Sequence, residues 1–426
     1  MNEKIRLLTI SVNAWNDTNS TGNTFSNVLG GFSNNKVANI FCRNEIPHNN
    51  IASAYFKITE RDIINKILGR KNSVGRVLKF KDFKTIEEDF QYKNLKGRRP
   101  TLLLFARELI WGLGNWKAEA LDTFLINFKP DVIYMHGHMG FYMHKLLKYC
   151  QEKTNAKTVL FFGDDMYSYK SYSPFMNLYQ FMMRKYLKTS ILNADLLYGG
   201  SQELCDEYTK IFGKTFKLLY KGIDSINRTS DEKKKDFPIT ITYTGNLLFG
   251  RWETLEMLAK EIEIINKTKQ TFFLKIFTQT TITDEMRKKI EIPGSSKIYG
   301  KVSYEEVKKL LKKSDIVLHV ESFSNKEIKK TRLSFSTKIV DNIQSGSCVM
   351  AIGPEKLSSI KYLKNSNSAI TISDISDISN VLKNIASNPE IISNNEVKML
   401  RFSDKNHNKK HIQNRVYNEL SQLIKC

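Results

Sequence analysis

The sequence contains few cysteines and few prolines for its length. Its 426 residues include five cysteines and eight prolines. No two cysteines have the Cys-x-x-Cys spacing and their number is odd, so we expect no disulfide framework and favour a reducing, cytoplasmic compartment. Long Gly/Ser-rich or low-complexity tracts are also missing. With 41% hydrophobic and 26% charged residues, the composition is that of a globular protein.

Long apolar runs are missing as well. No stretch approaches the ~20 uncharged apolar residues that a membrane-spanning helix needs. The N-terminal sequence MNEKIRLLTISVNAWN carries a Lys and an Arg, but its apolar run is too short for a secretory signal. We therefore expect a first β-strand in this segment and no membrane-spanning helix in the chain.

Positive charge is abundant, with a net charge of +22 at pH 7. Nucleic acid, an anionic membrane surface and anionic small molecules are the partners that such a charge favours. A lysine-rich composition without functional meaning explains it equally well. The basic residues are spread along the chain and no nucleic-acid-binding motif is present, so we expect no nucleic-acid partner.

Strand-like and helix-like segments alternate along the whole chain. This pattern predicts an α/β protein with parallel sheets covered by helices on both faces. The length fits two domains of about 200 residues. The predicted domains are residues 1–224, a polar linker at 225–238, residues 239–405, and a helix at 406–426 that packs back on the first domain. The predicted strands are 5–11, 37–43, 131–136, 158–163, 196–200, 217–221, 239–244, 272–277, 316–320, 348–352 and 369–373. The predicted helices are 23–33, 116–128, 140–152, 174–193, 202–211, 252–267, 303–313, 337–345, 375–387 and 408–424.

In doubly wound domains, ligands bind where the carboxyl ends of strands meet the N-termini of helices. In the second half of the chain, the segment TGNLLFGRWETL (244–255) follows the first strand. Gly245 permits a tight turn, and Arg251 offers a guanidinium to a phosphate beside a helix N-terminus. The alternative is an ordinary strand-to-helix turn with a solvated Arg.

The segment SFSTKIVDNIQSGSCVMAIGP (334–354) is more informative. Ser336 or Thr337 can cap a helix that carries Lys338 in its first turn. A cation does not stabilise the positive end of a helix, so Lys338 is a candidate for binding a diphosphate. Asp341 follows one turn later and can accept two hydrogen bonds from the vicinal hydroxyls of a ribose. The alternative is a capped amphipathic helix with surface charges.

These segments resemble the retaining family 4 glycosyltransferases, whose GT-B fold consists of two Rossmann-like domains that face a central cleft. VDNIQSG–SCVMAIG resembles the family's Glu-Ala-Met-Ala-x-Gly helix end and following strand, with Asp341 at the ribose-binding Glu. GNLLFGRW resembles the family's Gly-Arg-Leu…Lys-Gly segment, with Asn246 at its first basic position and Arg251 at its phosphate-binding Lys. Residues 197–224 resemble a third family segment. Because the three similarities follow in the family's order, the set is more specific than its parts.

The sequence departs from the family pattern at two places. Leu333 stands where the Glu-x7-Glu motif has its first Glu, and Glu321 or Glu327 could take over the contact with the donor sugar. The family's His after the fifth strand of the first domain is replaced by Gly163-Asp164-Asp165.

Two groups of titratable residues follow strands in the first half. Asp164 and Asp165 could meet the acceptor hydroxyl or hold its proton, cap a helix, or bind a divalent metal. The spacing of His136, His138 and His144 allows a zinc site, but no cluster of Asp, Glu or Cys supports one. We favour a cleft-lining role for His138 or His136, as the resemblance implies, and expect no metal.

Two further segments of the first half are candidates. Gly22 lies in the loop after the first strand, where Asn23 or Thr24 could cap the following helix. The resemblance implies that a Gly in this loop approaches the donor diphosphate or the acceptor. The apolar segment TLLLFARELIWGLGNW (101–116) follows the basic KNLKGRRP (93–100). It suits either docking at an anionic membrane surface or an ordinary buried helix.

The sequence thus predicts a glycosyltransferase that moves a sugar from a nucleotide-diphosphate donor to a glycan or lipid-linked saccharide acceptor. The resemblance implies retention of configuration, no metal or other cofactor, and a role in capsule, O-antigen or exopolysaccharide synthesis. A nucleotide-sugar 2-epimerase and a catalytically inactive GT-B scaffold are the alternatives. We expect a cytoplasmic protein that could attach peripherally to the inner face of the cell membrane. The candidate donor-binding residues are Gly22, Gly245, Asn246, Arg251, Glu321, Ser336, Thr337, Lys338 and Asp341, and the candidate catalytic residues are Asp164, Asp165 and His138.

Overall fold

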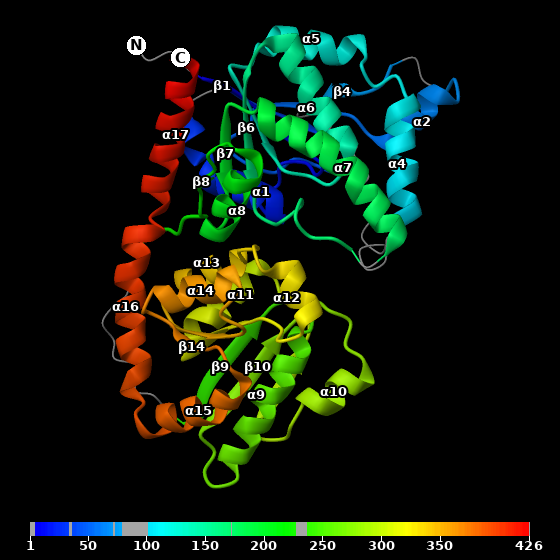
Figure 1. Ribbon diagram of the computed structural model, residues 1–426. Helices are drawn as coiled ribbons and strands as arrows, with labels where there is room; N and C mark the ends of the chain where they lie inside the picture. The colour runs from blue at the N-terminus through cyan, green and yellow to red at the C-terminus, as the bar shows by residue number, and fades with distance from the viewer. Residues whose placement is uncertain are drawn as a thin grey trace. The chain divides into compact units, whose positions relative to one another are not determined.

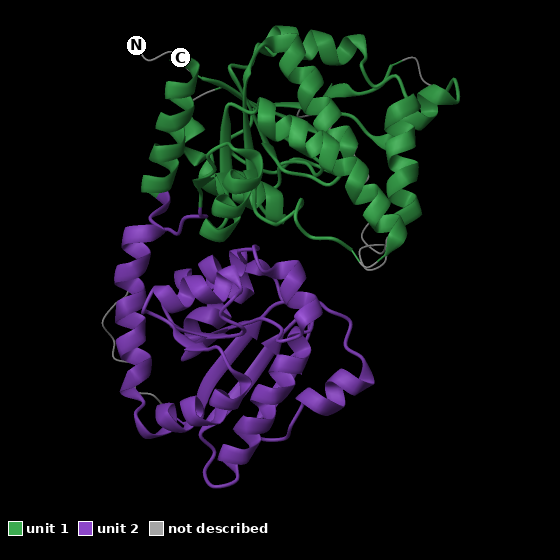
Figure 2. Ribbon diagram, in the orientation of Figure 1, with its two compact units in different colours: residues 1–219, 410–426 green, residues 220–409 purple. Residues whose placement is uncertain are grey.

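The computed structural model describes residues 5–33, 36–70, 73–78, 101–171, 173–226 and 237–425. The chain forms two compact units, each built around one sheet (Figure 1). Unit 1 comprises residues 1–219 and 410–426, and unit 2 comprises residues 220–409 (Figure 2). These two α/β units confirm the predicted fold class. Residues 227–236 of the predicted linker and the basic segment 93–100 lie outside the described residues.

Unit 1 is built on an eight-stranded sheet. Its strands are β1 (Arg6–Ser11), β2 (Lys36–Phe41), β3 (Ala54–Lys57), β4 (Arg76–Leu78), β5 (Val132–His136), β6 (Lys157–Phe162), β7 (Leu196–Gly199) and β8 (Lys217–Leu218). They lie in the order β4-β3-β2-β1-β5-β6-β7-β8, and among these described strands only β3 and β4 pair antiparallel. The order of connection reverses between β1 and β5, so the loops after these strands form the switch point of this sheet.

Helices cover both faces of the unit 1 sheet. They are α1 (Ser20–Val28), the 3-10 turn η1 (Gly30–Phe32), α2 (Glu60–Ile67), α4 (Thr101–Leu113), α5 (Glu119–Phe128), α6 (Phe141–Thr154), α7 (Pro174–Asn193), α8 (Gln202–Phe212) and α17 (Lys409–Lys425). Because side chains alternate along a strand, Leu7, Val132 and Val159 share one face, and α1 and α17 pack against it.

Helix α17 comes late in the chain but belongs to the core of unit 1. Its Ile412, Val416 and Leu420 are buried in the same cluster as β1 and β5. Gln413 Nε2 donates a hydrogen bond to the carbonyl oxygen of Asn27 at 2.8 Å. The N- and C-terminal parts of the chain therefore complete one core together.

Unit 2 is built on a six-stranded, all-parallel sheet. Its strands are β9 (Ile239–Thr244), β10 (Phe272–Phe277), β11 (Ser296–Tyr299), β12 (Ile316–Val320), β13 (Cys348–Ile352) and β14 (Ile370–Ile372). They lie in the order β11-β10-β9-β12-β13-β14. The switch point of this sheet is therefore between β9 and β12, at their carboxyl ends.

Helices bury both faces of the unit 2 sheet as well. They are α9 (Arg251–Asn266), α10 (Asp284–Ile290), α11 (Tyr304–Lys313), α12 (Asn325–Thr331), α13 (Thr337–Gln344), α14 (Ser358–Asn365), the 3-10 turn η3 (Ile375–Asp377), α15 (Ile378–Ser387) and α16 (Glu390–Asn406). Helices α9 and α15 pack on one face, and α13 and α14 pack on the other.

An aspartate directly before a strand fixes the amino end of that strand at three places in the two sheets. Asp131, Asp195 and Asp315 each directly precede a strand, and each accepts a backbone N–H from the neighbouring strand. The donor–acceptor distances are 2.8, 2.7 and 2.8 Å. These carboxylates satisfy amides at the edge opposite the switch points, so they are structural rather than catalytic.

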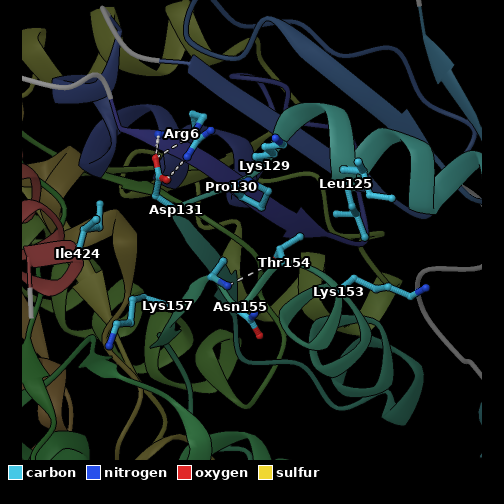
Figure 3. A pocket seen from close by; sticks show the side chains of 12 residues that line it. Arg6, Leu125, Lys129, Pro130, Asp131, Lys153, Thr154, Asn155, Lys157 and Ile424 are labelled. Atoms are coloured by element: carbon cyan, nitrogen blue, oxygen red, sulfur yellow. Dashed lines mark hydrogen bonds and ion pairs between the residues drawn. The ribbon is translucent and has the colours of Figure 1, made fainter.

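A hollow of about 520 Å³ opens at this amino edge in unit 1, beside Asp131 (Figure 3). In the close-up, Arg6 and Asp131 point toward each other. Carboxylates face most of its basic side chains, in the ion pairs Arg6–Asp131, Lys153–Asp122 and Lys157–Asp195. Since ligands of doubly wound sheets bind at the carboxyl ends of the strands, this hollow is not the expected site.

The packing of α17 generates a stability prediction. Leu420→Ala removes a fully buried side chain and is expected to lower the free energy of unfolding by about 2–4 kcal/mol. Ile424→Ala, on the same helix but 37% exposed, serves as the control and should change it by less than about 0.5 kcal/mol. Urea unfolding followed by tryptophan fluorescence measures both, and equal effects of the two changes would contradict the assigned packing.

Candidate functional site

The switch point of the unit 2 sheet carries an ion pair between Arg251 and Glu321. Glu321 directly follows β12, and Arg251 is the first residue of α9. Nη2 of Arg251 donates to Oε1 and Oε2 of Glu321 at 3.1 and 3.0 Å. Nη1 donates to Oδ1 of Asn246 at 3.0 Å, and Nε donates to the carbonyl oxygen of Val320 at 3.2 Å. The guanidinium is therefore held in one orientation at the ends of β9 and β12.

Glu321 is buried, with 5% of its side chain exposed. Burial raises the pKa of a carboxyl group, but His319 and the guanidinium of Arg251 outweigh this effect and hold the pKa of Glu321 below its usual range. Nε2 of His319 lies 3.3 Å from Oε1 of Glu321, without the alignment of a hydrogen bond. Glu321 is thus ionised and provides a fixed negative charge opposite Arg251.

The ammonium of Lys338 lies beside the glycine turn that follows β9. Lys338 is in the first turn of α13. A Cβ atom on Gly245 would lie 2.6 Å from Nζ of Lys338 and 2.6 Å from the hydroxyl oxygen of Tyr243, so the turn requires glycine. Gly245 and Lys338, both predicted donor-binding residues, are therefore brought together.

The surroundings of Lys338 disfavour its protonated form. Burial and the positive charge of Arg251 lower the pKa of Lys338 to about 8, although Glu321 and Asp341 act in the opposite direction. Within the described part of the chain, Nζ has no hydrogen-bonding partner. Lys338 thus places a second positive charge near the Arg251–Glu321 ion pair, and an anion can neutralise the surplus positive charge.

Asp341 lies one turn beyond Lys338 on α13. Its Oδ1 accepts from Nζ of Lys221 at 3.2 Å and from the hydroxyl of Tyr304 at 3.3 Å. Lys221 is mostly covered, with 11% of its side chain exposed. Within the described residues, Oδ2 accepts no hydrogen bond from the protein, so it can accept one from a ligand.

The N-terminus of α13 lacks a side-chain cap. Ser336 occupies the N-cap position, but its hydroxyl accepts no backbone N–H of the helix, and Thr337 is exposed as the first helical residue. The prediction that one of these residues caps the helix is therefore wrong. An uncapped N-terminus leaves first-turn amides available to an anion beside Lys338.

The position of the missing motif Glu has a structural role. Leu333 is 2% exposed and packs in the interior, where a carboxylate would be costly. Glu321, which could substitute for it, forms the ion pair with Arg251. Glu327 lies on α12, and its Oε2 is buried without a partner in the described part of the chain. A contact of either Glu with a donor sugar stays a prediction.

His138, at the switch point of unit 1, is a neutral hydrogen-bond donor. Its Nδ1 accepts the amide N–H of Gly140 at 2.8 Å, so the ring carries its proton on Nε2. Burial, together with nearby His144, lowers the pKa of His138 to about 3. In this state the ring can donate to a hydroxyl but cannot accept its proton at Nε2.

The other two histidines stabilise the loop after β5. His144 lies between Ser190 Oγ, 2.9 Å from Nδ1, and the carbonyl oxygen of His138, 2.8 Å from Nε2. The ring of His136 packs against Phe25 and Phe161 at centroid distances of 4.6 and 4.9 Å. No group of three His, Cys, Asp or Glu residues among those described could hold a metal ion.

Asp164 and Asp165 differ in their surroundings. Oδ1 of Asp165 accepts the backbone N–H groups of Tyr167 and Ser168 at 3.0 and 2.9 Å, and the hydroxyl of Tyr208 at 3.0 Å. This carboxylate therefore organises the turn after β6, but no helix begins there, so the prediction that it caps a helix is wrong. Asp164 is exposed and forms no hydrogen bond or ion pair in the described part of the chain.

Gly22 lies inside the first turn of α1 rather than before the helix. The cap is Asn19, whose Oδ1 accepts the N–H of Gly22 at 2.7 Å, so the prediction of Asn23 or Thr24 as the cap is wrong. A Cβ atom on Gly22 would lie 2.2 Å from the carbonyl oxygen of Asn16. The glycine thus allows the loop after β1 to pack tightly against α1.

Four residues of the unit 2 site were not found from the sequence. His319 and Tyr243 lie within strands, where the sequence predicts residues of the core. Lys221 and Tyr304 contact Asp341 but are distant from it in the chain.

No protein-family model matches the sequence, and a search of curated proteins gives no match. The structure is similar to solved structures over nearly its whole length. HepE from Anabaena in complex with UDP has a TM-score of 0.65 at 10% identity, covering 98% of this chain and 100% of that chain. Sucrose-phosphate synthase from Thermosynechococcus elongatus has a TM-score of 0.66 at 11% identity, covering 99% of each chain. The UDP-forming α,α-trehalose-phosphate synthase from Burkholderia vietnamiensis has a TM-score of 0.60 at 11% identity, covering 98% of this chain and 100% of that chain.

These neighbours are glycosyltransferases with the GT-B fold, and this chain has the same fold in both of its units. At identities of 10 and 11%, the similarity establishes the fold and not the activity.

The contrast between the two aspartates can be tested. Asp165→Ala leaves the amide of Ser168 and the hydroxyl of Tyr208 without their acceptor, and should lower the free energy of unfolding by about 1–3 kcal/mol. Asp164→Ala should change it by less than about 0.5 kcal/mol. Urea unfolding of the two variants measures the difference. Equal stability of the two would contradict the role of Asp165 in holding this turn.

Lys338 generates a pH-dependent prediction. Lys338→Met should raise the free energy of unfolding near pH 7 by about 1–3 kcal/mol, because a protonated Lys with a lowered pKa costs stability. The unfolded chain binds this proton up to pH 10.5 and the folded chain only up to about 8, so the cost fades as the pH rises through this interval. Urea unfolding at both ends of the interval measures the change, and an equal gain at both would contradict the lowered pKa.

Proposed function

We propose that the chain is a glycosyltransferase that transfers a sugar from a nucleoside diphosphate donor to a glycan or lipid-linked saccharide acceptor. The observation that carries this proposal is the pair of cations at the unit 2 switch point, Arg251 and Lys338, beside the uncapped N-terminus of α13. The resemblance to family 4 supports retention of configuration and a place in capsule, O-antigen or exopolysaccharide synthesis.

The cations suit the charge that develops during sugar transfer. When the bond between the anomeric carbon and the diphosphate breaks, the electron pair stays on the departing oxygen and negative charge grows on the diphosphate. Groups fixed before the reaction stabilise such charge without reorganisation. Arg251 is fixed by Glu321, Asn246 and Val320, and first-turn amides of α13 add partial positive charge. These residues can fulfil the task without a metal ion.

Asp341 is the proposed contact to the ribose of the donor. Its Oδ1 is shared by Lys221 and Tyr304, which orient the carboxylate, and Oδ2 can accept a hydroxyl hydrogen of the ribose. In the same way, His138 of unit 1 is proposed to donate its Nε2 hydrogen to a hydroxyl of a substrate sugar.

Two of the structural neighbours guide the choice of donor. HepE has been crystallised with UDP and with UDP-glucose, and the trehalose-phosphate synthase is described as UDP-forming. We therefore propose a UDP-sugar as the first donor to test, with GDP-, CMP- and ADP-sugars as comparisons.

A binding experiment tests the site. A nucleotide that binds the folded state raises the melting temperature, so we expect a clear increase with UDP or one of the comparison nucleotides. Arg251→Ala and Lys338→Ala should each weaken binding about 10- to 100-fold in calorimetry, because each removes a charge-assisted hydrogen bond. Lys313→Ala, an exposed lysine of α11, is the matched control and should bind as the unchanged protein does. Equal affinities of all three variants would refute the site.

A transfer assay tests the activity. With the bound nucleotide sugar and a pool of lipid-linked acceptors, we expect a glycosylated product whose formation is insensitive to EDTA, and Asp341→Ala should slow it about tenfold or more. Nucleotide binding without turnover would instead identify an inactive scaffold. Epimerised sugar nucleotide formed without an acceptor would identify a 2-epimerase.

A further inference from the structure

Unit 1 exposes large apolar side chains on three of its helices. Helix α4 contacts both α2 and α7. Among the described residues, half of all exposed large hydrophobic side chains lie on these three helices. Isolated exposed apolar residues are common, but a cluster of this size marks an interaction surface.

Helix α4 is amphipathic, but its leucine-rich face is exposed and its acidic residue is buried. Leu102, Leu109 and Leu113 are 76, 61 and 71% exposed and follow one another at helical spacing on one face. The opposite face buries Glu108 and Trp111. The leucines therefore face solvent while the only acidic residue of the helix faces the interior.

Glu108 explains why this orientation is stable. Its carboxylate accepts the first two backbone amides of α6, those of Phe141 and Tyr142, at 2.8 and 3.0 Å. It also accepts the hydroxyl of Tyr179 from α7 at 2.9 Å. These three hydrogen bonds anchor α4 to α6 and α7, so its leucines cannot turn inward without leaving buried polar groups unpaired.

Helix α7 continues the apolar surface. Phe175, Leu178 and Phe181 are 73, 54 and 73% exposed. The ring of Phe105 on α4 packs edge-on against Tyr179 on α7 at 5.3 Å between centroids, which joins the two helices. We call the three leucines of α4 and these three residues of α7 the apolar patch.

The exposed charges on α7 beside the apolar patch are positive. The sequence of α7 contains no Asp or Glu, and its Lys185 and Lys188 are exposed. On α4 the single acidic residue is buried. An exposed apolar surface with lysines beside it matches the boundary between the headgroups and acyl chains of an anionic bilayer.

We infer that unit 1 docks on an anionic lipid surface through the apolar patch, with α4 and α7 lying in the plane of the interface. No helix within the described residues has the length and apolar character to cross a bilayer. The inference does not depend on the proposed transferase activity, because it concerns a surface and not the unit 2 site.

Co-sedimentation with vesicles tests the inference. The protein should pellet with vesicles of phosphatidylcholine mixed with phosphatidylglycerol, and much less with phosphatidylcholine alone. The variant Leu109→Ser, Leu113→Ser, Phe175→Ser, Phe181→Ser should bind the anionic vesicles at least about tenfold more weakly. The matched control, Ile264→Ser with Val397→Ser, changes two residues of unit 2 that are 50 and 46% exposed, and should bind as the unchanged protein does.

A second variant separates charge from folding. Lys185→Glu with Lys188→Glu alters exposed side chains only, and should weaken binding to anionic vesicles at least about fivefold. Circular dichroism and thermal melting check that each variant is folded. Equal pelleting of both variants and the unchanged protein would overturn the inference. A dimer in solution that the Ser variant converts to a monomer, without vesicle binding by either, would assign the apolar patch to a second copy of the chain.

Discussion

The buried carboxylate of Glu321 is the constraint on which the unit 2 site depends. Without its charge, Arg251 and Lys338 would repel each other in a place with little water to screen them. The carboxylate of Glu321 orients the guanidinium of Arg251 and neutralises its charge, so that the charge of Lys338 remains. Glu321 can come so close to β13 because Gly353 follows that strand, where a Cβ atom would lie 2.9 Å from Cβ of Glu321. Backbone geometry and charge thus define the site together.

The switch points of the two sheets have opposite chemical characters. In unit 2 the ends of β9 and β12 carry ionised groups. In unit 1 the histidines after β5 are neutral, since burial lowers the pKa of His136 and His138 to about 3 and that of His144 to about 4. One sheet is therefore equipped for an anion, and the other for hydrogen bonds to uncharged hydroxyl groups.

Much of the fold could be predicted from the sequence because its signals are local. The β-branched run ITITYT marks β9 (Ile239–Thr244), and Pro174 marks the start of α7, and both elements begin and end where they were predicted. Strands β3, β4 and β11 were not predicted, since each has only three or four residues and so carries little periodicity. Several helices were also not predicted, among them α14 and α16, whose burial depends on neighbours distant in the chain.

The positions of the site residues in helices and strands could be predicted from the sequence, but the contacts between these residues could not. Arg251 and Lys338 stand at helix starts, which the sequence reveals. The partner of Arg251 is Glu321, 70 residues later in the chain, and only the adjacency of β9 and β12 brings the two together. In the same way, the hydrogen bonds of Asp165 come from the turn it organises and from α8, so a paired carboxylate motif alone could not reveal its role.

The return of α17 to unit 1 has a consequence for the order of folding during synthesis. Unit 2 is contiguous, so the whole of residues 220–409 is available before α17 has been made. Unit 1 meanwhile lacks Ile412, Val416 and Leu420 and exposes the sheet face that these residues later cover. During synthesis, unit 2 can therefore fold before α17 is available to complete the core of unit 1. We expect unit 1 to have the greater need of a chaperone.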